Sequence, residues 1–538
     1  MQKSGKLELT WVGKYEEKEI EPRILVENPE LSYGDQDTGN MLIHGDNLIA
    51  LKALEQDYAG KIKCIYIDPP YNTGSAFEYY DDGIEHSEWL NMMRPRLKIL
   101  KSLLADDGFF CCHIDDSESH YLKVLLDEIF SRSNYLTTFY IRVRYPDKTL
   151  KSDMDFHKEI EQIFIYRKSS NAVPFFEYED VGYEKFIYQI KEEADGKEFY
   201  LGNKKVVKFE KDEYKILKKE SGDEFGLKEV WASGTILDGN SSGRFFRDYL
   251  TGRYVEDGYG VLYKVYGIGD DRYNYRYFTG PQKEGATKGK YYQGVPINKL
   301  ELDKIERKNP IGGFYDMAGN FGNCRQEGNV GFRGGKKPER LLYTILKCFS
   351  KENDLILDSF LGSGTTIAVA HKMNRRWIGI ELGDHAYSLC KTRLDNVING
   401  DKTGISKDVN WHGGGGYKFY ELAPSLLVPN PKITSIKQIN PEYTFEQLCE
   451  AICKIEGFKY KPENNMHGRS SEKRFIHIAK DFVNGEYVNS ILSTLADDES
   501  VLIYGTKIQS GLRLPSNVQV KKIPKDLLDK CTFESEVR

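Results

Sequence analysis

The sequence lacks the long apolar runs and the cysteine patterns that define several protein classes. None of its hydrophobic stretches approaches the ~20 residues that cross a bilayer as a helix, and the opening MQKSGKLELT does not resemble a secretion signal. The nine cysteines are scattered and odd in number, which does not fit a disulfide framework, and no cysteine and histidine cluster completes a zinc site. We therefore expect a cytoplasmic protein with no membrane contact and no metal.

The chain also has no excess of positive charge. Its net charge of −6 over 538 residues argues against a protein that coats nucleic acid non-specifically, although it allows a local basic groove. The glycines do not fall in the GxGxxG spacing of a dinucleotide-binding turn. A chain of this length is too long for one compact core, so we expect two to four domains.

One stretch, Lys61 to Tyr71, organises the rest of the chain. Its first part, KIKCIYI, is a nearly continuous apolar run, which predicts a strand buried on both faces of a parallel sheet. The strand has to stop at Asp68-Pro69-Pro70-Tyr71, because a proline has no N–H to donate to a neighbouring strand. The turn then lies at the carboxyl end of the strand, where open α/β sheets bind ligands.

The Asp68-Pro69-Pro70-Tyr71 turn fits the chemistry of an exocyclic amine on a nucleobase. The lone pair of such an amine is delocalised into the ring, so the amine is a poor nucleophile. The Asp68 carboxylate and the Pro69 carbonyl, on a turn that Pro70 stiffens, can accept its two N–H groups and localise the lone pair. Tyr71 can stack on the base. The alternative is a strand-ending turn with an ordinary exposed aspartate.

A second motif, DLILDSFLGSGTT, lies far downstream. Asp358 ends an apolar run, and a glycine-rich turn leads from it into a helix, an arrangement that lets the backbone approach a ligand closely. The next apolar run ends in Glu381, and an acid at that position can hold ribose hydroxyls. A purely structural glycine turn is the alternative. The residues that we expect to bind a cofactor here are Asp358, Phe360, Gly362, Gly364, Thr365 and Glu381.

Together the two motifs resemble a known family. DPPYNTG and DSFLGSGTT are similar to the motifs of amino-group DNA methyltransferases that use S-adenosylmethionine, and their order resembles the β arrangement of that family. The longer strings TWVGKYE, SYGDQDTGNMLIHGDNLIALKALE, RYFTGPQKEGATKGKYYQGVP and WHGGGGYKFYEL resemble the modification subunits of type III restriction systems. This resemblance extends to about residue 420 and is thinner beyond it.

The resemblance implies a fold, an activity and partners. The fold is a doubly wound, Rossmann-like α/β domain, and the reaction is methyl transfer from S-adenosylmethionine to adenine N6 in double-stranded DNA, with the target adenine flipped out of the stack. The implied partners are a second copy in a homodimer and an ATP-dependent restriction subunit that is a nuclease and translocase. Asp46 would lie near the adenine of the cofactor; capping of a helix is the other explanation for this residue.

Other functions stay open on the sequence alone. A solitary epigenetic adenine methyltransferase would share every catalytic residue. In the resembled family, a cytosine-N4 enzyme more often has serine where this chain has Asp68. A non-catalytic DNA-binding specificity subunit would use the cofactor pocket only to support a complex. A protein or RNA methyltransferase is disfavoured, because the large insert between the two motifs suits long, sequence-read DNA.

Composition changes after residue 168, where charges mix and apolar periodicity weakens. The catalytic domain is therefore expected in two halves on either side of an insert. The expected boundaries are an N-terminal arm at 1–40, the first half at 41–168, an inserted target-recognition domain at 169–330, the second half at 331–420, and a small C-terminal α/β domain at 421–538.

The insert interleaves tyrosines with cations between residues 261 and 296, a pattern that suits phosphate contact and base stacking. The alternative is a β-rich domain whose tyrosines form its own core. We expect most of the tyrosines to pack and some of the basic residues to touch DNA. The candidate substrate contacts are Arg272, Arg276, Lys288 and Lys290 in the insert, and Phe77 as a second wall for the target base.

Overall fold

The computed structural model describes residues 8–16, 20–72, 84–146, 156–180, 182–232, 241–286, 288–297, 306–332, 335–433 and 436–528. By its internal contacts the chain divides into two units. The first consists of Met1–Phe175 and Ile311–Arg538, and the second of Phe176–Pro310. Within the described ranges, no helix has the length and apolar character that crossing a membrane requires.

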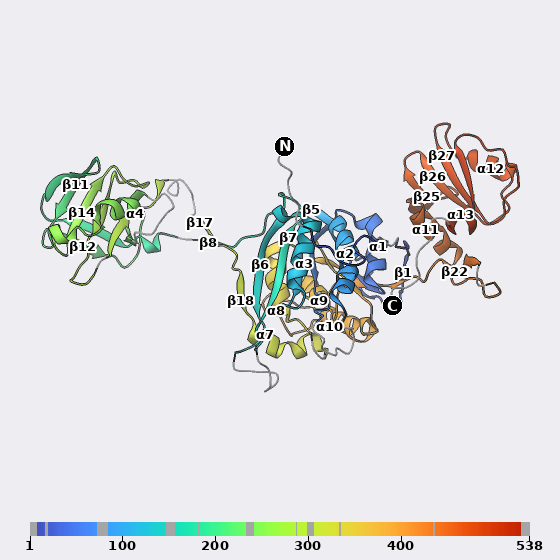
Figure 1. The fold of residues 1–538 in the computed structure, drawn as a ribbon, viewed down its shortest axis with the longest axis horizontal. Coiled ribbons are helices and arrows are strands. Elements are labelled where there is room, and N and C mark those ends of the chain that lie inside the picture. The colour runs from blue at the N-terminus through green and yellow to red at the C-terminus, as the bar shows by residue number, and fades with distance from the viewer. Residues whose placement is uncertain are drawn as a thin grey trace. The chain divides into compact units, whose positions relative to one another are not determined.

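A large sheet forms the centre of the first unit (Figure 1). Its strand order is β1-β21-β3-β20-β19-β4-β5-β7-β6-β18, with β2 paired to β21. The six strands from β21 to β5 are parallel, β7 is antiparallel to both neighbours, and β18 is parallel to β6. The strands are β1 Leu25–Glu27, β2 Tyr33–Gly34, β3 Met41–His44, β4 Ile62–Ile67, β5 Leu104–Ile114, β6 Tyr135–Arg142, β7 Ile160–Arg167, β18 Phe314–Asp316, β19 Leu355–Asp358, β20 Arg376–Glu381 and β21 Gly416–Leu422.

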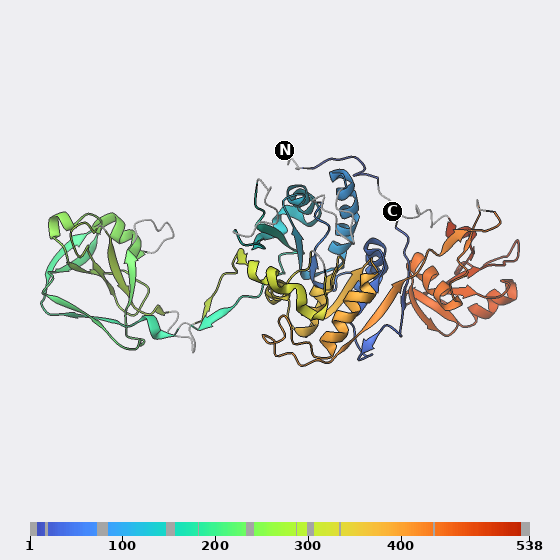
Figure 2. The same cartoon turned by 90° about the horizontal axis from the view of Figure 1, so that it is seen from below.

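Helices cover both faces of this sheet, which agrees with the doubly wound fold expected from the sequence (Figures 1 and 2). Two separate apolar clusters fill the spaces between sheet and helices, one on each face. The helices from the first half of the chain pack on one face, and those from the second half on the other. They are α1 Asn47–Tyr58, α2 His86–Leu103 and α3 Ser119–Leu126, and α8 Glu339–Phe349, α9 Thr365–Lys372 and α10 Thr392–Ile398.

The direction of chain winding reverses between two adjacent strands. From β4 the chain crosses through α2 to β5 on one side, and from β19 it crosses through α9 to β20 on the other side. Open α/β sheets bind ligands at the carboxyl ends of strands at such a reversal. The residues at those ends are Asp68 after β4 and Asp358 at the end of β19, so the two motifs come from distant parts of the sequence to the ends of two adjacent parallel strands.

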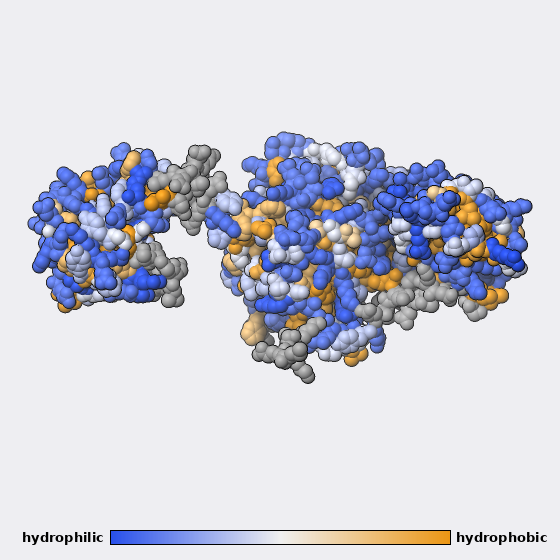
Figure 3. Space-filling model, turned by 90° about the horizontal axis from the view of Figure 1, so that it is seen from above, coloured by the Kyte–Doolittle hydropathy of each residue, from blue (hydrophilic) through white to orange (hydrophobic). Residues whose placement is uncertain are grey.

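The second unit is built on a six-stranded antiparallel sheet with the order β10-β11-β14-β15-β16-β13. Helices α4 and η4 cover one face, and the strand pair β9 and β12 packs on the other. Hydrophilic residues cover most of its visible surface in Figure 3. The elements are β9 Tyr188–Glu192, β10 Lys197–Leu201, β11 Lys204–Phe209, β12 Tyr214–Lys218, β13 Lys228–Ala232, α4 Ser241–Phe245, η4 Phe246–Leu250, β14 Leu262–Tyr266, β15 Tyr275–Thr279 and β16 Gly289–Gln293; α5 Tyr254–Asp257 and the pair β8 Tyr178–Asp180 and β17 Glu306–Lys308 complete the unit.

The C-terminal part contains a five-stranded sheet with the order β24-β25-β26-β27-β28. Its first pairs are antiparallel and its last two are parallel. This mixed sheet with helices has the α/β character expected there, and these residues are grouped with the first unit by their contacts; the expected separate domain at 421–538 stays a prediction. Its elements are β22 Leu427–Pro429, β23 Lys437–Ile439, α11 Phe445–Ile455, β24 Lys459–Glu463, β25 Met466–Ser471, β26 Arg474–Ala479, α12 Gly485–Leu492, β27 Ser500–Gly505, β28 Val518–Lys522 and α13 Lys525–Leu528.

The structure differs from the sequence-based expectation in the extent of the insert. The compact unit covers 176–310 rather than 169–330. Residues 311–330 belong to the first unit, because β18 adds a parallel strand to β6 and is followed by α7 Ala318–Asn323 and η5 Cys324–Asn329. Backbone pairing between segments this far apart leaves no local pattern in the sequence, so composition alone placed the boundary wrongly.

Candidate active site

Four adjacent parallel strands are each followed by, or end in, a carboxylate. In spatial order these are β3, β20, β19 and β4, and the acids are Asp46, Glu381, Asp358 and Asp68. Such an edge favours a ligand that carries positive charge, amines or hydroxyls over one that carries phosphates. Among the described residues, no group of three or more His, Cys, Asp or Glu side chains could hold a metal ion.

Asp68 has one oxygen engaged and one without a partner. Its Oδ2 lies 3.2 Å from the Lys337 ammonium. Its Oδ1 is buried and has no hydrogen-bond partner within the described part of the chain. Buried carboxylate oxygens are normally hydrogen-bonded, so an orphaned one in a crevice marks a place for a ligand donor. The preceding strand is fully buried near this end, which fixes the backbone that carries Asp68.

Tyr71 is held at its hydroxyl by two groups. The hydroxyl accepts a hydrogen bond from Lys337 Nζ at 2.7 Å and donates one to Glu161 Oε2 at 3.1 Å. Burial and the nearby carboxylates of Asp68 and Glu161 raise the pKa of Tyr71 well above its usual value, so the ring stays a neutral phenol. The peptide carbonyl of Pro70 accepts from the indole of Trp89 at 2.8 Å, which anchors the turn to α2.

Lys337 and Glu161 were not among the site residues predicted from the sequence. Lys337 precedes Pro338 at the start of α8, and Glu161 lies on β7, an otherwise largely apolar strand. Their charged groups are 3.3 Å apart, and both side chains are largely buried. The sequence signal for Glu161 is an acid placed inside a largely apolar run.

The glycine-rich turn after β19 is shaped by Asp358. The Asp358 carboxylate accepts from the Phe360 amide at 2.9 Å and from the Thr366 hydroxyl at 2.6 Å. Burial, opposed by these hydrogen bonds, raises the pKa of Asp358 to about 7. Gly364 caps α9 with a left-handed φ of 76°, a conformation that glycine adopts without strain. Asp358 thus holds the turn together and is itself buried beneath it.

Glu381 ties the two cofactor-side loops to each other. Its Oε2 accepts from the Gly362 amide at 2.6 Å, and its Oε1 accepts from the amides of Leu382 and Gly383. The side chain is buried. His385 Nε2 lies 3.1 Å from Oε1 as well, so four groups of the protein surround this carboxylate. The expected contact to ribose hydroxyls stays a prediction.

Asp46 does cap the helix that follows it. Its Oδ1 accepts from the amides of Leu48 and Ile49, and its Oδ2 pairs with Arg96 at 3.1 Å. Because the Asp46 strand directly precedes the Asp68 strand in the sequence, the sequence alone predicts that the two strands are neighbours. That prediction is wrong, because β20 and β19 both lie between β3 and β4. The contact to the cofactor adenine stays a prediction.

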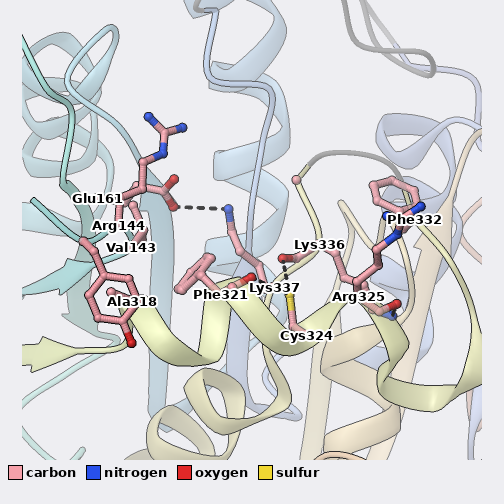
Figure 4. Close-up of a pocket in the computed structure, with 13 residues that line it drawn as sticks. Val143, Arg144, Glu161, Ala318, Phe321, Cys324, Arg325, Phe332, Lys336 and Lys337 are labelled. Carbon is pink, nitrogen blue, oxygen red and sulfur yellow. Dashed lines mark hydrogen bonds and ion pairs between the residues drawn. The ribbon is translucent and has the colours of Figure 1, made fainter. Parts of the chain in front are cut away.

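A cavity of about 820 Å³ opens beside the Lys337–Glu161 pair (Figure 4). In the close-up the carboxylate of Glu161 and the ammonium of Lys337 point toward each other, and the Cys324 thiol contacts the backbone of Lys336. Its lining combines cations with aromatic rings, which suits a polar, planar ligand. It consists of Val143, Arg144, Tyr145, Glu161, Ala318, Phe321, Gly322, Cys324, Arg325, Phe332, Gly335, Lys336 and Lys337.

The basic residues expected to contact DNA in the insert fall into different environments. Arg276 is buried, with its guanidinium 2.7 Å from Asp271, so the expected surface contact was wrong for this residue. Arg272 pairs with Glu224, and Lys290 pairs with Glu229. Lys288 is exposed. Phe77 lies outside the described residues.

The expectation that most of the interleaved tyrosines pack agrees with the structure. Buried tyrosines contribute to the apolar clusters on both faces of the six-stranded sheet. They are Tyr263, Tyr277, Tyr291 and Tyr292.

Comparison with known proteins gives a family match and several relatives. The model of a family described as DNA methylase matches residues 62–392. The probable type III restriction-modification enzyme HindVI Mod subunit of Haemophilus influenzae is 35% identical over 76% of this chain and 58% of its own length. The type III restriction-modification enzyme EcoPI Mod subunit of Escherichia phage P1 is 26% identical over 74% of this chain and 65% of its own length. The chain therefore spans about three fifths of these relatives.

A solved structure described as PvuII DNA methyltransferase (cytosine-N4-specific) aligns with 73% of this chain and 94% of that chain, at 12% identity and a TM-score of 0.33. The family match runs from the first residue of β4 to the first residue of α10, and so includes both motifs and the crevice between them. Because that match covers more than half of the sequence, the chain belongs to the DNA methylase family.

Proposed function

We propose that this chain transfers a methyl group from S-adenosylmethionine to the N6 amine of adenine within a specific DNA sequence, as the modification subunit of a type III restriction system. The observation that carries the proposal is the buried Oδ1 of Asp68, which has no hydrogen-bond partner among the described residues. An amine offers two N–H donors, and the Pro69 carbonyl beside Asp68 is a second acceptor for it.

The acidic strand edge fits the proposed cofactor. S-adenosylmethionine carries a sulfonium, an ammonium and ribose hydroxyls, and it supplies a methyl group already activated for attack by a nucleophile. Glu381 and Asp46 are the acids placed to accept hydroxyl or amine donors, and the turn from Phe360 to Gly364 would bring backbone close to the ligand. Asp358 would act indirectly, because it holds that turn from below.

The residues of the chain would then act on the target base. Asp68 Oδ1 and the Pro69 carbonyl accept the two N–H groups of the amine, which localises its lone pair for attack. Tyr71 stacks on the ring, a contact worth about 1–3 kcal/mol. The base must leave the DNA stack to reach this crevice, because its amine is otherwise paired. The relatives that are named Mod subunits support the type III assignment, and with it a homodimer and an ATP-dependent restriction subunit as partners.

The first experiment is to incubate the purified chain with methyl-labelled S-adenosylmethionine and unmethylated genomic DNA, and then to analyse the nucleosides and map the modified sites. The expected product is N6-methyladenine at one short motif, and methylation of one strand only would support the type III assignment. N4-methylcytosine would contradict the choice of base. Bound S-adenosylmethionine without any transfer would instead favour the non-catalytic specificity subunit.

A further inference from the structure

Lys337 joins the proposed catalytic groups to a second acid. Its ammonium contacts Asp68 Oδ2 at 3.2 Å, the Tyr71 hydroxyl at 2.7 Å and Glu161 Oε2 at 3.3 Å. It also lies 4.7 Å from the centre of the Tyr71 ring. These groups come from three separate segments, the turn after β4, strand β7 and the start of α8. One side chain therefore fixes both the acceptor and the stacking ring.

The charges in this cluster depend on each other. Burial raises the pKa of Glu161, but the Lys337 ammonium and His113 outweigh it and hold that pKa well below the usual range. Burial lowers the pKa of Lys337, but the carboxylates of Asp68 and Glu161 raise it above its usual value. Glu161 and Lys337 are thus both charged near neutral pH, and the Lys337 ammonium contacts the carboxyl groups of both Glu161 and Asp68. Removal of the cation would leave two buried carboxylates facing each other.

Other titratable groups surround the cluster and have to be included in any account of its pH dependence. They are Tyr66 on β4, His113 on β5, whose Nε2 lies 2.9 Å from Glu161, and Asp358 on β19. Arg144, Arg325 and Lys336 line the same cavity.

The backbone of Lys337 is also tied to the cofactor-side turn. The Thr365 hydroxyl at the start of α9 donates to the Lys337 carbonyl at 3.1 Å. The neighbouring Lys336 has a different task, since its ammonium donates to the carbonyls of Arg325, Glu327 and Val330 and closes the end of η5. Of the two adjacent lysines, Lys336 holds local backbone and Lys337 reaches the reacting groups.

We propose that Lys337 is a positioning residue of the methyl transfer, which occupies Oδ2 of Asp68 and the hydroxyl of Tyr71 so that Oδ1 of Asp68 faces the incoming amine, with Glu161 as the counter-charge that holds Lys337 in place. This inference rests on the proposed function. The contacts of Lys337 with Asp68, Tyr71 and Glu161 would then do more than stabilise the fold, because the orientation of Asp68 decides which of its oxygens accepts the amine. A merely structural ion pair would stabilise the fold without affecting the pH dependence of turnover.

The test compares Lys337→Met, Lys337→Arg, Glu161→Gln and the double variant Lys337→Met with Glu161→Gln. We expect Lys337→Met to lower kcat about 100-fold, in the range found when one preorganised group is lost, with the KM for S-adenosylmethionine within about threefold of wild type. One of the two facing carboxylates then takes up a proton, so its kcat should rise with pH between about 6 and 8. Lys337→Arg keeps the positive charge, so its kcat should be at least about tenfold higher than that of Lys337→Met.

The double variant separates the effect of repulsion between two carboxylates from the effect of losing the Lys337 side chain. Glu161→Gln removes the second carboxylate, so the double variant should turn over about tenfold faster at pH 7 than Lys337→Met alone, and its kcat should no longer rise with pH. Arg340→Met is the matched control, because Arg340 lies on the same helix and pairs with Asp408 on the surface. We expect it to leave kcat unchanged.

Two results would overturn the inference. One is a kcat for Lys337→Met within threefold of wild type. The other is a pH profile of that variant that matches wild type and does not respond to Glu161→Gln. An absence of transfer by wild-type protein would overturn the proposed function instead, and the pH dependence of unfolding then tests the cluster alone. Lys337→Met should lose stability relative to wild type as pH rises from about 4 to 7, and Glu161→Gln should remove that loss.

Discussion

Two aspartates, one in each unit, form an ion pair with a largely buried cation and differ in the contacts of their other oxygen. Asp271 in the second unit has a partner for both oxygens: Oδ1 accepts from the Tyr273 amide, and Oδ2 accepts from Arg276 and from the Gly294 amide. Asp68 in the first unit pairs with Lys337 through Oδ2 and has no partner for Oδ1 among the described residues. Both oxygens of Asp271 are therefore hydrogen-bonded, whereas only one oxygen of Asp68 has a partner among the described residues.

This difference teaches how to separate a structural ion pair from a functional one. A buried carboxylate whose hydrogen bonds are all to groups of the same protein holds elements together. Its removal leaves a buried cation without a counter-charge. A buried carboxylate with an unused acceptor costs stability unless a ligand supplies the donor. Asp271 is also the more deeply buried of the two, with 1% of its side chain exposed against 19% for Asp68, so the comparison depends on the unpaired Oδ1 of Asp68 and not on burial alone.

Substitution of Asp68 gives the largest expected effect. Asp68→Ala should lower methyl transfer about 10³-fold or more, because the amine loses its charged acceptor and its lone pair stays delocalised. Binding of S-adenosylmethionine should persist, since the cofactor-side turn keeps its own contacts. Single-turnover transfer to DNA and equilibrium cofactor binding measure the two effects separately.

The control for Asp68 is Asp107→Ala, which removes an exposed carboxylate that pairs with Lys63. It should leave transfer unchanged. Near-normal turnover of Asp68→Ala would mean that the Oδ1 of Asp68 has no part in the reaction. An unpaired carboxylate oxygen would then not distinguish a functional aspartate from a structural one such as Asp271.

Substitution of Asp271 tests the other half of the comparison. Asp271→Ala should destabilise the second unit by about 3–5 kcal/mol, because it leaves the buried Arg276 guanidinium without its counter-charge. Hydrogen exchange of the 176–310 segment measures this effect apart from the rest of the chain. Asp270→Ala is the matched control: Asp270 is 67% exposed and lies 3.3 Å from the same guanidinium, so its loss should cost less than about 1 kcal/mol. Equal effects of the two substitutions would refute the structural assignment.

The sequence was sufficient to predict the strands and turns around Asp68 and Asp358, because they depend on local pattern. Buried apolar runs followed by Asp68-Pro69-Pro70-Tyr71 and by a glycine-rich turn predicted two parallel strands with ligand groups at their carboxyl ends. The structure pairs these two strands in parallel, and the ligand groups stay a prediction. Lys337 and Glu161 could not be found in this way. They are 176 positions apart, and their contact depends on how the chain returns to the sheet after the insert.

The insert shows the opposite limit. Cations that alternate with tyrosines along a strand look the same whether they face solvent or lie buried against a neighbouring strand. Arg276 is buried, and its guanidinium donates to Asp271 and to Ser242. Ser242 lies 34 positions away in the sequence, so no local pattern predicts that contact. The pairing register between strands decides which of these side chains are buried, and amino-acid composition does not predict that register.

Asp358 extends the comparison, because it lies at the same strand edge as Asp68 but accepts a hydrogen bond at each oxygen. Its pKa of about 7 means that the folded protein keeps a proton that the unfolded chain releases near pH 4. Stability should therefore fall as pH rises from about 4 to about 7, by on the order of 2–4 kcal/mol, and level off above that. Asp358→Asn should flatten this part of the pH profile in chemical unfolding. An unchanged slope in the variant would assign the pH dependence to another group.

The smallest expected effect concerns Lys288, which is exposed, whereas Arg272 and Lys290 have carboxylate partners. If an exposed cation meets DNA only where no carboxylate in the described part of the chain pairs with it, Lys288→Ala should weaken DNA binding by less than about 1 kcal/mol and reduce the slope of log affinity against log salt by about one. Fluorescence anisotropy with a labelled duplex at several salt concentrations measures both quantities. Lys215→Ala is the control, because Glu193 neutralises that lysine at 2.8 Å, and its salt slope should match wild type. A changed slope for Lys215→Ala together with an unchanged one for Lys288→Ala would show that pairing in the free protein does not predict which cations bind DNA.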